Sequence, residues 1–475
     1  MKRMRLSEII AAVDGSPGAA GTDDPAITGV CTDSRKVEPG ELFVPLCGEH
    51  HDGHDFIAGA FERGAAASLS SRDASAGSGR RIVKVSDTLT ALEDLALYNR
   101  GELSFEVTAI TGSVGKTTTK EFLKHILGTD FTVAAAPKSF NNRLGVALTL
   151  LETDEDTEHL VVEMGTSGKG ELSYLSKRVR PERIIITTVA PAHLEGLEDL
   201  PGIIAAKAEI FEGLDPAGCA YLNPAAPGYE EFRACLDGEP RTYGTVGADF
   251  PLELIPAAGG AQAGYRFRVG AEEYTLELPG EHNVTNAGGA IAVALDLGVS
   301  PASIREGLAR CRLPPGRLNV WTEAGVHFVD DSYNANPCSM KAALDTFEEY
   351  CAGITEGRNI AVLGEMLELG PRSRHYHAEI GSLLAGKPVD LLVTIRGSSR
   401  YLGEAFTRER ESRGRRGDAK TMHFEELSPA REYLSEEIRS GDKLLFKASN
   451  AVGLSGLAEE LRETVGAGER EPPLV

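Results

Sequence analysis

The sequence has no surplus of positive charge. Its 49 Lys and Arg residues are outnumbered by 71 Asp and Glu residues, which gives a formal net charge of -22. Because proteins bind nucleic-acid backbones through an excess of Lys and Arg, this balance argues against nucleic acid as the main partner. A phosphorylated small molecule stays open, since a few local cations and backbone N–H groups can hold one.

Long apolar runs and paired cysteines are also missing. No stretch approaches the roughly 20 apolar residues that cross a bilayer, and Glu8 interrupts the apolar part of the basic start, MKRMRLSEIIAAVDG. We therefore expect no membrane partner and no signal peptide. The seven cysteines are scattered, odd in number and without a CxxC pair. They predict reduced thiols in a cytoplasmic protein, without a zinc site.

The composition is that of a globular protein, with 41% hydrophobic and 25% charged residues, and 475 residues predict two to four domains. Residues 1–100 alternate short strand-like runs with helix-like ones, including a helix expected over 56–68, and predict a small α/β unit. In residues 101–316, a hairpin is expected around the Gly/Ala-rich turn IPAAGGAQAG. Residues 317–475 alternate strands and helices in the rhythm of a doubly wound parallel sheet, and their last residues are expected to be disordered.

The sharpest motif is a phosphate-binding loop, which follows Thr111 and runs Gly112-Ser113-Val114-Gly115-Lys116-Thr117-Thr118. It lies between a predicted strand and an amphipathic helix. Glycines let backbone N–H groups point inward, Lys116 can reach the outer phosphates, and the Thr117 hydroxyl can bind Mg²⁺. The first glycine of the usual pattern is replaced by Ile110, so only the shorter GxxGKT form is present.

The loop predicts a nucleoside triphosphate and leaves the reaction open. P-loops serve kinases, GTPases, motor ATPases and ligases. Ser113 and Lys116 also match the SxxK signature of some serine acylases, but the SDN and KTG companions are absent. A kinase or nucleotidase, which would leave phosphate on the substrate or in water, remains an alternative.

A metal and reacting centre is predicted from three residues further along. Glu163 ends a strand-like run, and His193 follows the next one. If the strands are parallel, both emerge at the same edge as the loop and could share Mg²⁺ with phosphate oxygens. Lys207 has mostly apolar neighbours, and burial would depress its pKa and make the neutral amine reactive.

Taken together, the runs resemble the Mur ligase family. The likeness extends over essentially the whole chain in the family's order, through CTDSRKVEPGELFVPLCGEHHDGHDF, TGSVGKTTTKE, SFNNRLGVALTLL, EMGTSGKGEL, PAHLEGL, AKAEIF, GEHNVTNA, GRLNVW, DDSYNANP and LGEMLELG. The run DDSYNANP resembles the corresponding run of the members that add D-alanyl-D-alanine. The DNPR run of the diaminopimelate-adding members is absent.

The resemblance implies an α/β fold of three domains. Residues 1–100 would bind the UDP substrate, 101–316 would form a central P-loop mononucleotide-binding domain that takes ATP, and 317–475 a C-terminal Rossmann-like doubly wound domain that takes the incoming dipeptide. The implied reaction is ATP-dependent addition of D-alanyl-D-alanine to UDP-N-acetylmuramoyl-tripeptide through an acyl phosphate, in peptidoglycan precursor synthesis. We expect a monomer with Mg²⁺, in which the domains close around hinges near residues 100 and 316.

The resemblance also implies residue roles. Lys116, His193, Lys207 and Arg317 would be catalytic, and Lys207 matches the family lysine that is carbamylated. Thr117, Glu163 and His193 would bind metal. The nucleotide would be held by residues 111–118, Asn283, Asn286, Arg317 and Asp331. Substrate-binding residues would be Thr32, Asp33, Ser34 and Arg35 on the UDP side, Asn141 and Asn142 in the central domain, and Asn334 and Asn336 on the dipeptide side.

Three positions depart from the family pattern. Thr188 stands where Asn is expected, Thr166 where Asn or Ala is usual, and Asn450 where the run KGSR has an arginine that would help bind the dipeptide carboxylate. These departures bear on the choice of acceptor amine rather than on ATP chemistry. They leave open a relative that adds a single amino acid and a nucleotide-binding regulator without turnover.

Overall fold

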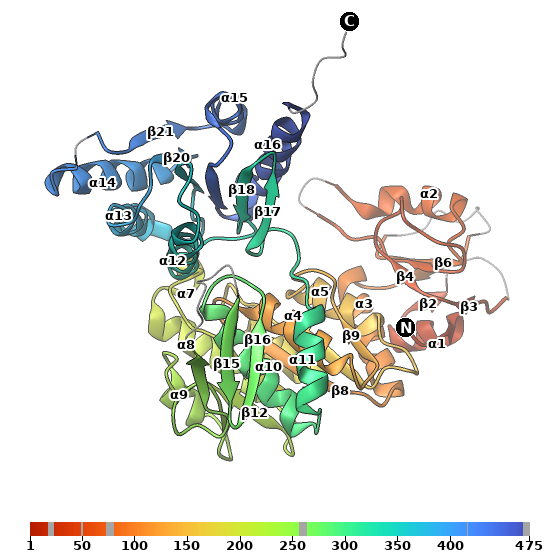
Figure 1. The fold of residues 1–475 in the computed structure, drawn as a ribbon. Coiled ribbons are helices and arrows are strands. Elements are labelled where there is room, and N and C mark those ends of the chain that lie inside the picture. The colour runs from red at the N-terminus through yellow and green to blue at the C-terminus, as the bar shows by residue number, and fades with distance from the viewer. Residues whose placement is uncertain (18–22, 49–50, 73–79, 256–263, 416, 469–475) are drawn as a thin grey trace, which may run out of the picture.

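The computed structural model describes residues 1–17, 23–48, 51–72, 80–255, 264–415 and 417–468. Three α/β regions follow one another along the chain. The N-terminal and C-terminal regions lie on different sides of the central one (Figure 1). This arrangement confirms the predicted α/β class. The predicted boundary at 100 falls within helix α3, which spans Thr88–Glu102, and the boundary at 316 falls between a helix and a strand.

The N-terminal region is built on a five-stranded sheet of order β2-β7-β6-β5-β4, in which only β2 is antiparallel to its neighbour. A separate antiparallel pair joins β1 to β3. The elements are β1 (Met4–Arg5), α1 (Leu6–Ala12), β2 (Ser16–Pro17), β3 (Ala26–Ile27), β4 (Val30–Cys31), β5 (Leu42–Phe43), η1 (Gly53–Phe56), α2 (Ile57–Glu62), β6 (Ala67–Ser70), β7 (Ile82–Lys84) and α3.

The central region has a parallel six-stranded sheet of order β13-β12-β11-β8-β10-β9, with β8 flanked by β10 and β11. Its elements are β8 (Glu106–Thr111), α4 (Lys116–Leu127), β9 (Val133–Ala135), α5 (Arg143–Leu151), β10 (His159–Glu163), α6 (Glu171–Val179), β11 (Arg183–Ile186), α7 (Leu194–Leu197), α8 (Leu200–Ala208), η2 (Glu209–Gly213), β12 (Cys219–Leu222), α9 (Tyr229–Arg233), β13 (Arg241–Thr242), β14 (Leu252–Ile255), β15 (Tyr265–Val269), β16 (Glu272–Leu276), α10 (His282–Asp296) and α11 (Pro301–Arg310).

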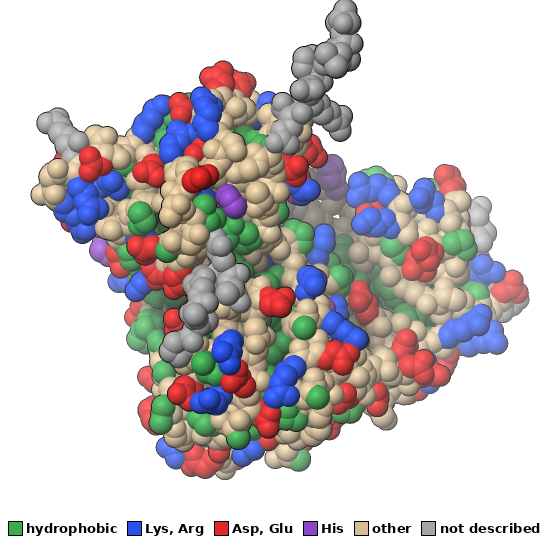
Figure 2. All heavy atoms as spheres, viewed as in Figure 1, with side chains coloured by type: hydrophobic (Ala, Val, Ile, Leu, Met, Phe, Trp, Pro, Cys, Tyr) green, Lys and Arg blue, Asp and Glu red, His purple; other side chains and the backbone are tan. Residues whose placement is uncertain are grey.

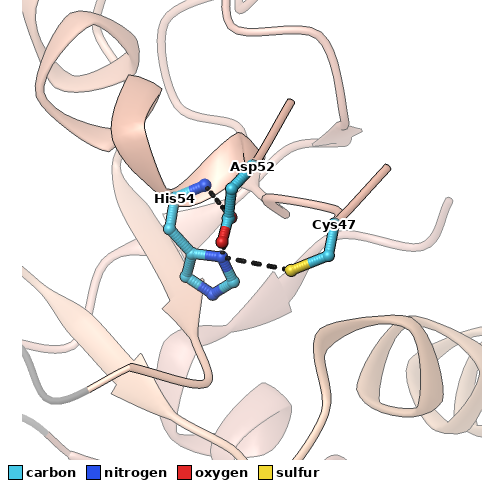
Figure 3. Close-up of side chains that lie close together, drawn as sticks. All are labelled: Cys47, Asp52 and His54. Carbon is cyan, nitrogen blue, oxygen red and sulfur yellow. Dashed lines mark hydrogen bonds and ion pairs between the residues drawn. The ribbon is translucent and has the colours of Figure 1, made fainter. Parts of the chain in front are cut away.

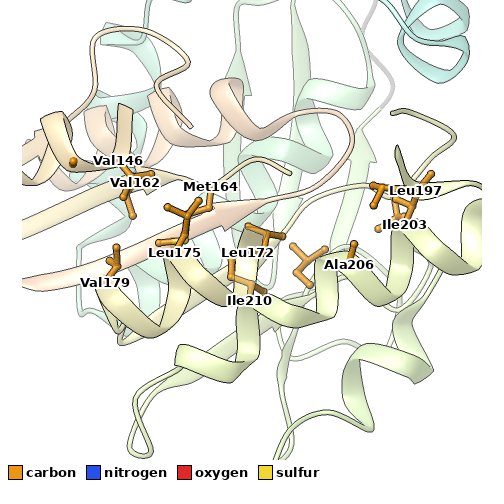
Figure 4. Packing of buried hydrophobic residues seen from close by; sticks show 14 of the residues in the cluster. Val146, Val162, Met164, Leu172, Leu175, Val179, Leu197, Ile203, Ala206 and Ile210 are labelled. Atoms are coloured by element: carbon orange, nitrogen blue, oxygen red, sulfur yellow. The ribbon is translucent and has the colours of Figure 1, made fainter. Parts of the chain in front are cut away.

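Both faces of the central sheet are buried, as expected of parallel strands. Alternation along β10 sends Val162 to one face and Val161 to the other. The first face packs against α5, α6 and α8 (Figure 4). The second packs against α4, α10 and α11 and the antiparallel sheet β14-β15-β16. The layers therefore hold the carboxyl ends of β8, β10 and β11 in fixed register.

The C-terminal region contains a six-stranded sheet of order β17-β18-β22-β19-β20-β21, parallel except for the β17–β18 pair. Its elements are β17 (Asn319–Glu323), β18 (Val326–Asp330), α12 (Pro337–Ala352), β19 (Asn359–Gly364), η4 (Gly370–Arg372), α13 (Ser373–Leu384), β20 (Leu391–Ile395), α14 (Ser399–Ser412), β21 (Lys420–Phe424), α15 (Leu427–Glu437), β22 (Lys443–Lys447), η5 (Asn450–Val452) and α16 (Leu454–Gly468).

Some predicted elements need correction. The helix expected over 56–68 ends at Glu62, and Ala67–Ser70 forms a buried strand because it pairs with β5 and β7. The C-terminal sheet is not purely parallel, since β17 adds an antiparallel edge. The expected hairpin is present as the β14–β15 pair, but most of its turn, 256–263, lies outside the described residues. So do residues 469–475 of the tail.

Surface charge is mixed on the face seen in Figure 2, with Lys and Arg side chains interspersed among Asp and Glu. The same view shows the surface hollowed between the N-terminal and C-terminal regions. Of the helices in the described ranges, none combines the length and apolar character that crossing a bilayer requires.

Candidate active site

A cleft of about 1100 Å³ lies between the central and C-terminal sheets and reaches Leu89 of α3. Its walls come from the carboxyl ends of parallel strands in both sheets, the segments that follow them, and the start of α10. In open α/β sheets ligands bind at this edge. The cleft is therefore the candidate active site.

The phosphate loop joins β8 to α4 and depends on two glycines with positive φ. Gly112 has φ 150° and Gly115 has φ 88°. A Cβ on Gly115 would lie 2.3 Å from Oδ1 of Asn286 on α10, so the loop and α10 can be this close only with glycine here. Lys116 begins α4, and its Nζ donates to the Gly112 carbonyl at 2.9 Å. The helix N-terminus thus opens onto the cleft, where it favours anions.

The segment after β11 holds the loop from its other side. Ser113 N donates to Thr188 O at 2.7 Å, and Thr187 Oγ1 donates to Val114 O at 2.6 Å. Ser113 Oγ and the backbone of Ala190 exchange hydrogen bonds of 2.9 and 3.0 Å. Because Thr188 contributes its carbonyl, its departure from the family's Asn leaves this contact intact.

A network of oxygen atoms surrounds the Thr117 hydroxyl at the base of the cleft. Thr117 Oγ1 donates to Oε2 of buried Glu163 at 2.8 Å, and Asn141 Nδ2 donates to the other carboxylate oxygen at 2.8 Å. The Arg317 Nη2 donates to Thr117 Oγ1 at 3.0 Å and to Ser139 Oγ at 3.1 Å. A cation from the linker between two regions therefore lies directly against the threonine of the phosphate loop.

Arg317 is held in this position by an aromatic ring. Its guanidinium carbon lies 4.1 Å from the centre of the Tyr333 ring, a cation–π distance. Tyr333 comes from the segment after β18, in the C-terminal region. The linker arginine is thus fixed from the C-terminal side while it contacts the central side.

Two lysines near the loop have depressed pKa values. Burial lowers the pKa of Lys116, an effect that Glu163 opposes and Arg317 reinforces. Burial, and then the neighbouring Lys116 charge, lowers the pKa of Lys207 well below its ordinary value of 10.5. The Lys207 side chain is buried and does not line the cleft. The sequence-based expectation of a buried, low-pKa Lys207 agrees with this placement.

His193 lies at the rim of the cleft with left-handed backbone, φ 53°. Its Nδ1 is 2.5 Å from Oε2 of Glu368, although the two atoms are not in hydrogen-bond alignment. Glu163 and His193 line the same cleft, as the parallel-strand argument predicted.

The α10 side of the cleft presents amides next to the loop. Asn283 Nδ2 donates to Pro279 O at 2.8 Å, and Asn286 Nδ2 to Asn283 Oδ1 at 3.3 Å. Across the cleft, the buried Lys447 donates to Asp331 Oδ2 at 2.5 Å and to Asn334 O at 3.0 Å. This ion pair fixes Asp331 at the end of β18.

Three family models cover most of the chain. "Mur ligase family, catalytic domain" matches residues 26–100, "Mur ligase middle domain" residues 110–294, and "Mur ligase, glutamate ligase domain" residues 316–450. The UDP-N-acetylmuramoyl-tripeptide–D-alanyl-D-alanine ligase of Bacillus subtilis is 34% identical over 472 residues, which covers 98% of this chain and 99% of that protein. The chain belongs to the Mur ligase family.

Solved structures agree with the sequence comparison. MurF from Acinetobacter baumannii is 30% identical and superposes on this Mur ligase with a TM-score of 0.84, over 98% of this chain and 99% of that one. MurF from Thermotoga maritima, solved in complex with ADP, is 26% identical with a TM-score of 0.75, over 93% and 98% of the two chains. The fold of three α/β regions is thus that of a Mur ligase.

Most of the residues that the sequence singled out line the cleft of this Mur ligase. The cleft-lining ones are Ser113, Val114, Gly115, Lys116, Thr117, Thr118, Asn141, Asn142, Glu163, His193, Asn283, Asn286, Arg317, Asp331, Asn334 and Asn336. Thr111, Gly112 and Lys207 do not line it. Thr32, Asp33, Ser34 and Arg35 lie away from it in the N-terminal region, where Arg35 forms an ion pair with Asp33.

Several cleft residues were not singled out individually. They include Ser139, Arg143, Tyr333, Glu368 and Lys447. The first four stand within runs that carry the family resemblance, and Lys447 lies in the departing segment that ends at Asn450. Their partners lie far away in the sequence, as Glu368 and His193 do. Of the departures, Asn450 and Thr166 line the cleft.

A second group of possible metal ligands lies in the N-terminal region, where Asp52 and Cys47 both approach Nδ1 of His54, at 2.6 and 3.8 Å (Figure 3). The Nε2 of His54 accepts from Ser71 N at 3.0 Å, so the proton of a neutral ring is on Nδ1. Arg72 already pairs with Asp52. Because both ring nitrogens already have hydrogen-bond partners, we interpret this group as one that stabilises the turn around Gly53.

Proposed function

We propose that this Mur ligase joins D-alanyl-D-alanine to UDP-N-acetylmuramoyl-tripeptide, with conversion of ATP to ADP and phosphate. The observation that carries the proposal is the full-length relationship to D-alanyl-D-alanine ligases, combined with a phosphate loop that faces the C-terminal sheet across one cleft. A kinase transfers phosphate to one acceptor and needs no further binding site for an amine. The proposed setting is the cytoplasm and the proposed state a monomer.

The chemistry begins with a carboxylate, which is a poor electrophile. A carboxylate oxygen of the tripeptide attacks the γ-phosphorus, an O–P bond forms, and the bond between that phosphorus and the bridging oxygen of ADP breaks. Lys116 and Arg317 would stabilise the charge on the transferred phosphoryl group through preorganised electrostatics. The dipeptide amine then attacks the acyl carbon, a C–N bond forms, the amine loses a proton, and phosphate leaves.

The residues around Thr117 fit a magnesium ion. Its hydroxyl and the Glu163 carboxylate are hard oxygen ligands that already lie 2.8 Å apart. Thr117, Glu163 and His193 would hold the ion. When bound, Mg²⁺ neutralises charge on the phosphate oxygens during transfer.

Lys207 fits a carbamate. Its depressed pKa provides the neutral amine that carbon dioxide requires, and the N–C bond forms as the nitrogen loses a proton. The product carries a negative charge. It would be attracted to the neighbouring Lys116, whose charge disfavours a protonated Lys207.

The remaining roles are those that the family resemblance implies. We infer that Asn283, Asn286 and Asp331 contact the nucleotide, and that Asn334 and Asn336 lie on the dipeptide side. Asn141 and Asn142 would contact the tripeptide. Thr32, Asp33, Ser34 and Arg35 would bind the UDP part on the N-terminal region, which requires a substrate that spans the distance to the cleft.

The test combines the chain with ATP, Mg²⁺ and UDP-N-acetylmuramoyl-tripeptide, and compares D-alanyl-D-alanine with single amino acids as acceptors. Mass spectrometry should detect one new amide per ADP released, with the dipeptide only. Release of ADP without an amide would contradict ligase activity. Equal use of a single amino acid would contradict the dipeptide assignment and point to Asn450 as the cause.

A further inference from the structure

Two short segments from different sheets meet at the rim of the cleft. One contains His193 and α7, which lies where the central region faces the C-terminal one (Figure 1). The other contains Glu368, in the segment between β19 and η4. Glu195 N donates to Glu368 O at 3.3 Å, and the Glu368 carboxylate reaches Nδ1 of His193. The contact therefore joins the two regions through both backbone and side chain.

Both residues at this contact have unfavourable backbone conformations. His193 has φ 53° and Glu368 has φ 63°, and neither is a glycine. Left-handed conformation costs roughly 1–2 kcal/mol for such residues. Strain of this kind persists where the surrounding structure over-determines it, and it concentrates at functional sites. Because two such residues are in contact across a domain boundary, we interpret the contact as functional.

Each segment is also fixed to its own region. On the central side, Ser113 of the phosphate loop bonds the backbone of Ala190, three residues before His193. On the C-terminal side, Met366 N donates to Nε2 of buried His377 at 2.9 Å, and Leu367 N donates to Ser449 Oγ at 2.9 Å. The pair of His193 and Glu368 thus completes a connection from the phosphate loop to the C-terminal sheet.

The contact also decides which ring nitrogen of His193 is available. Nδ1 is buried against Glu368, whereas the side chain as a whole is 29% exposed and lines the cleft. This leaves Nε2 as the nitrogen that can face a ligand in the cleft. A metal-binding histidine usually donates its other N–H to a carboxylate, which fixes its tautomer and orientation.

We propose that Glu368 is a positioning residue that acts through His193. The negative charge of its carboxylate, 2.5 Å from Nδ1, favours the tautomer with the proton on Nδ1, leaves Nε2 to face the cleft, and makes the cation site complete only when the C-terminal region lies against the central one. The proposal rests on the proposed role of His193 as a metal ligand.

The test measures Mn²⁺ binding to the full-length chain in the presence of a non-hydrolysable ATP analogue, by electron paramagnetic resonance. Glu368→Ala should weaken Mn²⁺ binding by about 10- to 100-fold, the range found when an outer partner of a metal-bound histidine is removed. The pulsed spectrum of the unsubstituted chain should show modulation from a His193 nitrogen bound to Mn²⁺. This modulation should be absent in His193→Ala.

The matched control is Glu195→Ala. Glu195 is an exposed glutamate at the same contact and takes part through its backbone N–H. It should bind Mn²⁺ within about twofold of the unsubstituted chain. Unchanged binding in Glu368→Ala, or an equal loss in Glu195→Ala, overturns the proposal. If the unsubstituted chain shows no nitrogen modulation, His193 is not a metal ligand and the proposal fails. Amide formation by the same preparation would still support the ligase assignment.

Discussion

Replacing Thr117 with valine should damage both stability and catalysis, because the hydroxyl is the centre of a buried network. The side chain is 1% exposed, donates to Glu163 at 2.8 Å and accepts from Arg317 at 3.0 Å. A hydrogen bond to a charged group contributes about 1.5–3 kcal/mol, and Glu163 would be left short of a donor. We expect unfolding to become easier by about 2 kcal/mol, and the ligase rate to fall by about 10²–10³-fold.

Thr119, two residues further along α4, provides the control. It is fully buried, but its hydroxyl has no hydrogen-bond partner among the described residues. Burying an unpaired hydroxyl costs about 1–3 kcal/mol, so Thr119→Val should leave stability unchanged or raise it.

Calorimetry and ligase assays on both variants test this reasoning. For a domain of this size, 2 kcal/mol corresponds to a fall in Tm of about 4–8 °C in the transition of the central region. Two results would refute the argument: Thr117→Val melting with the unsubstituted chain, or Thr119→Val losing as much stability as Thr117→Val.

Three further predictions concern the phosphate loop and the neighbouring Lys207. Lys116→Ala should lower kcat/KM by at least about 10³-fold in a coupled ADP assay, since it removes charge from the phosphate site; near-normal turnover would contradict its role. Gly115→Ala should weaken binding of an ATP analogue by more than about tenfold in calorimetric titration, because alanine is strained at φ 88° and would clash with Asn286. Gly101→Ala should bind normally, because a Cβ added there would meet nothing within 4 Å. Lys207→Met should be more stable than the parent in buffer free of carbon dioxide. The low folded-state pKa of Lys207 destabilises the parent as pH falls below 10.5, so this advantage should shrink as pH rises toward 10.5; an advantage that does not change with pH would contradict the shifted pKa.

The sequence predicted local features well. The β8–loop–α4 unit is contiguous in the sequence, and its glycines and lysine predict a phosphate-binding loop within seven residues. The placement of Glu163 and His193 at one edge followed from parallel strand order, which a βαβ rhythm implies. Ala67–Ser70 was misassigned because alanine favours helix locally, whereas pairing with two neighbouring strands decides its conformation.

Contacts between regions could not be predicted. Arg317 meets Thr117 across 200 positions, and Glu368 meets His193 across a domain boundary. Neither pair has a periodic or spacing signature. Their positions depend on how two sheets face each other, and this is decided by packing over the whole chain rather than by any local run.

The location of Arg317 in the linker has a consequence for ATP hydrolysis that is not coupled to amide formation. If the C-terminal region swings away, Tyr333 moves with it and the guanidinium loses the ring that fixes it beside Thr117. An open molecule would then hold a nucleotide whose terminal phosphate lacks one of its charge-stabilising groups at the moment when water has easiest access. The same opening that separates the substrates would then disfavour hydrolysis without an acceptor.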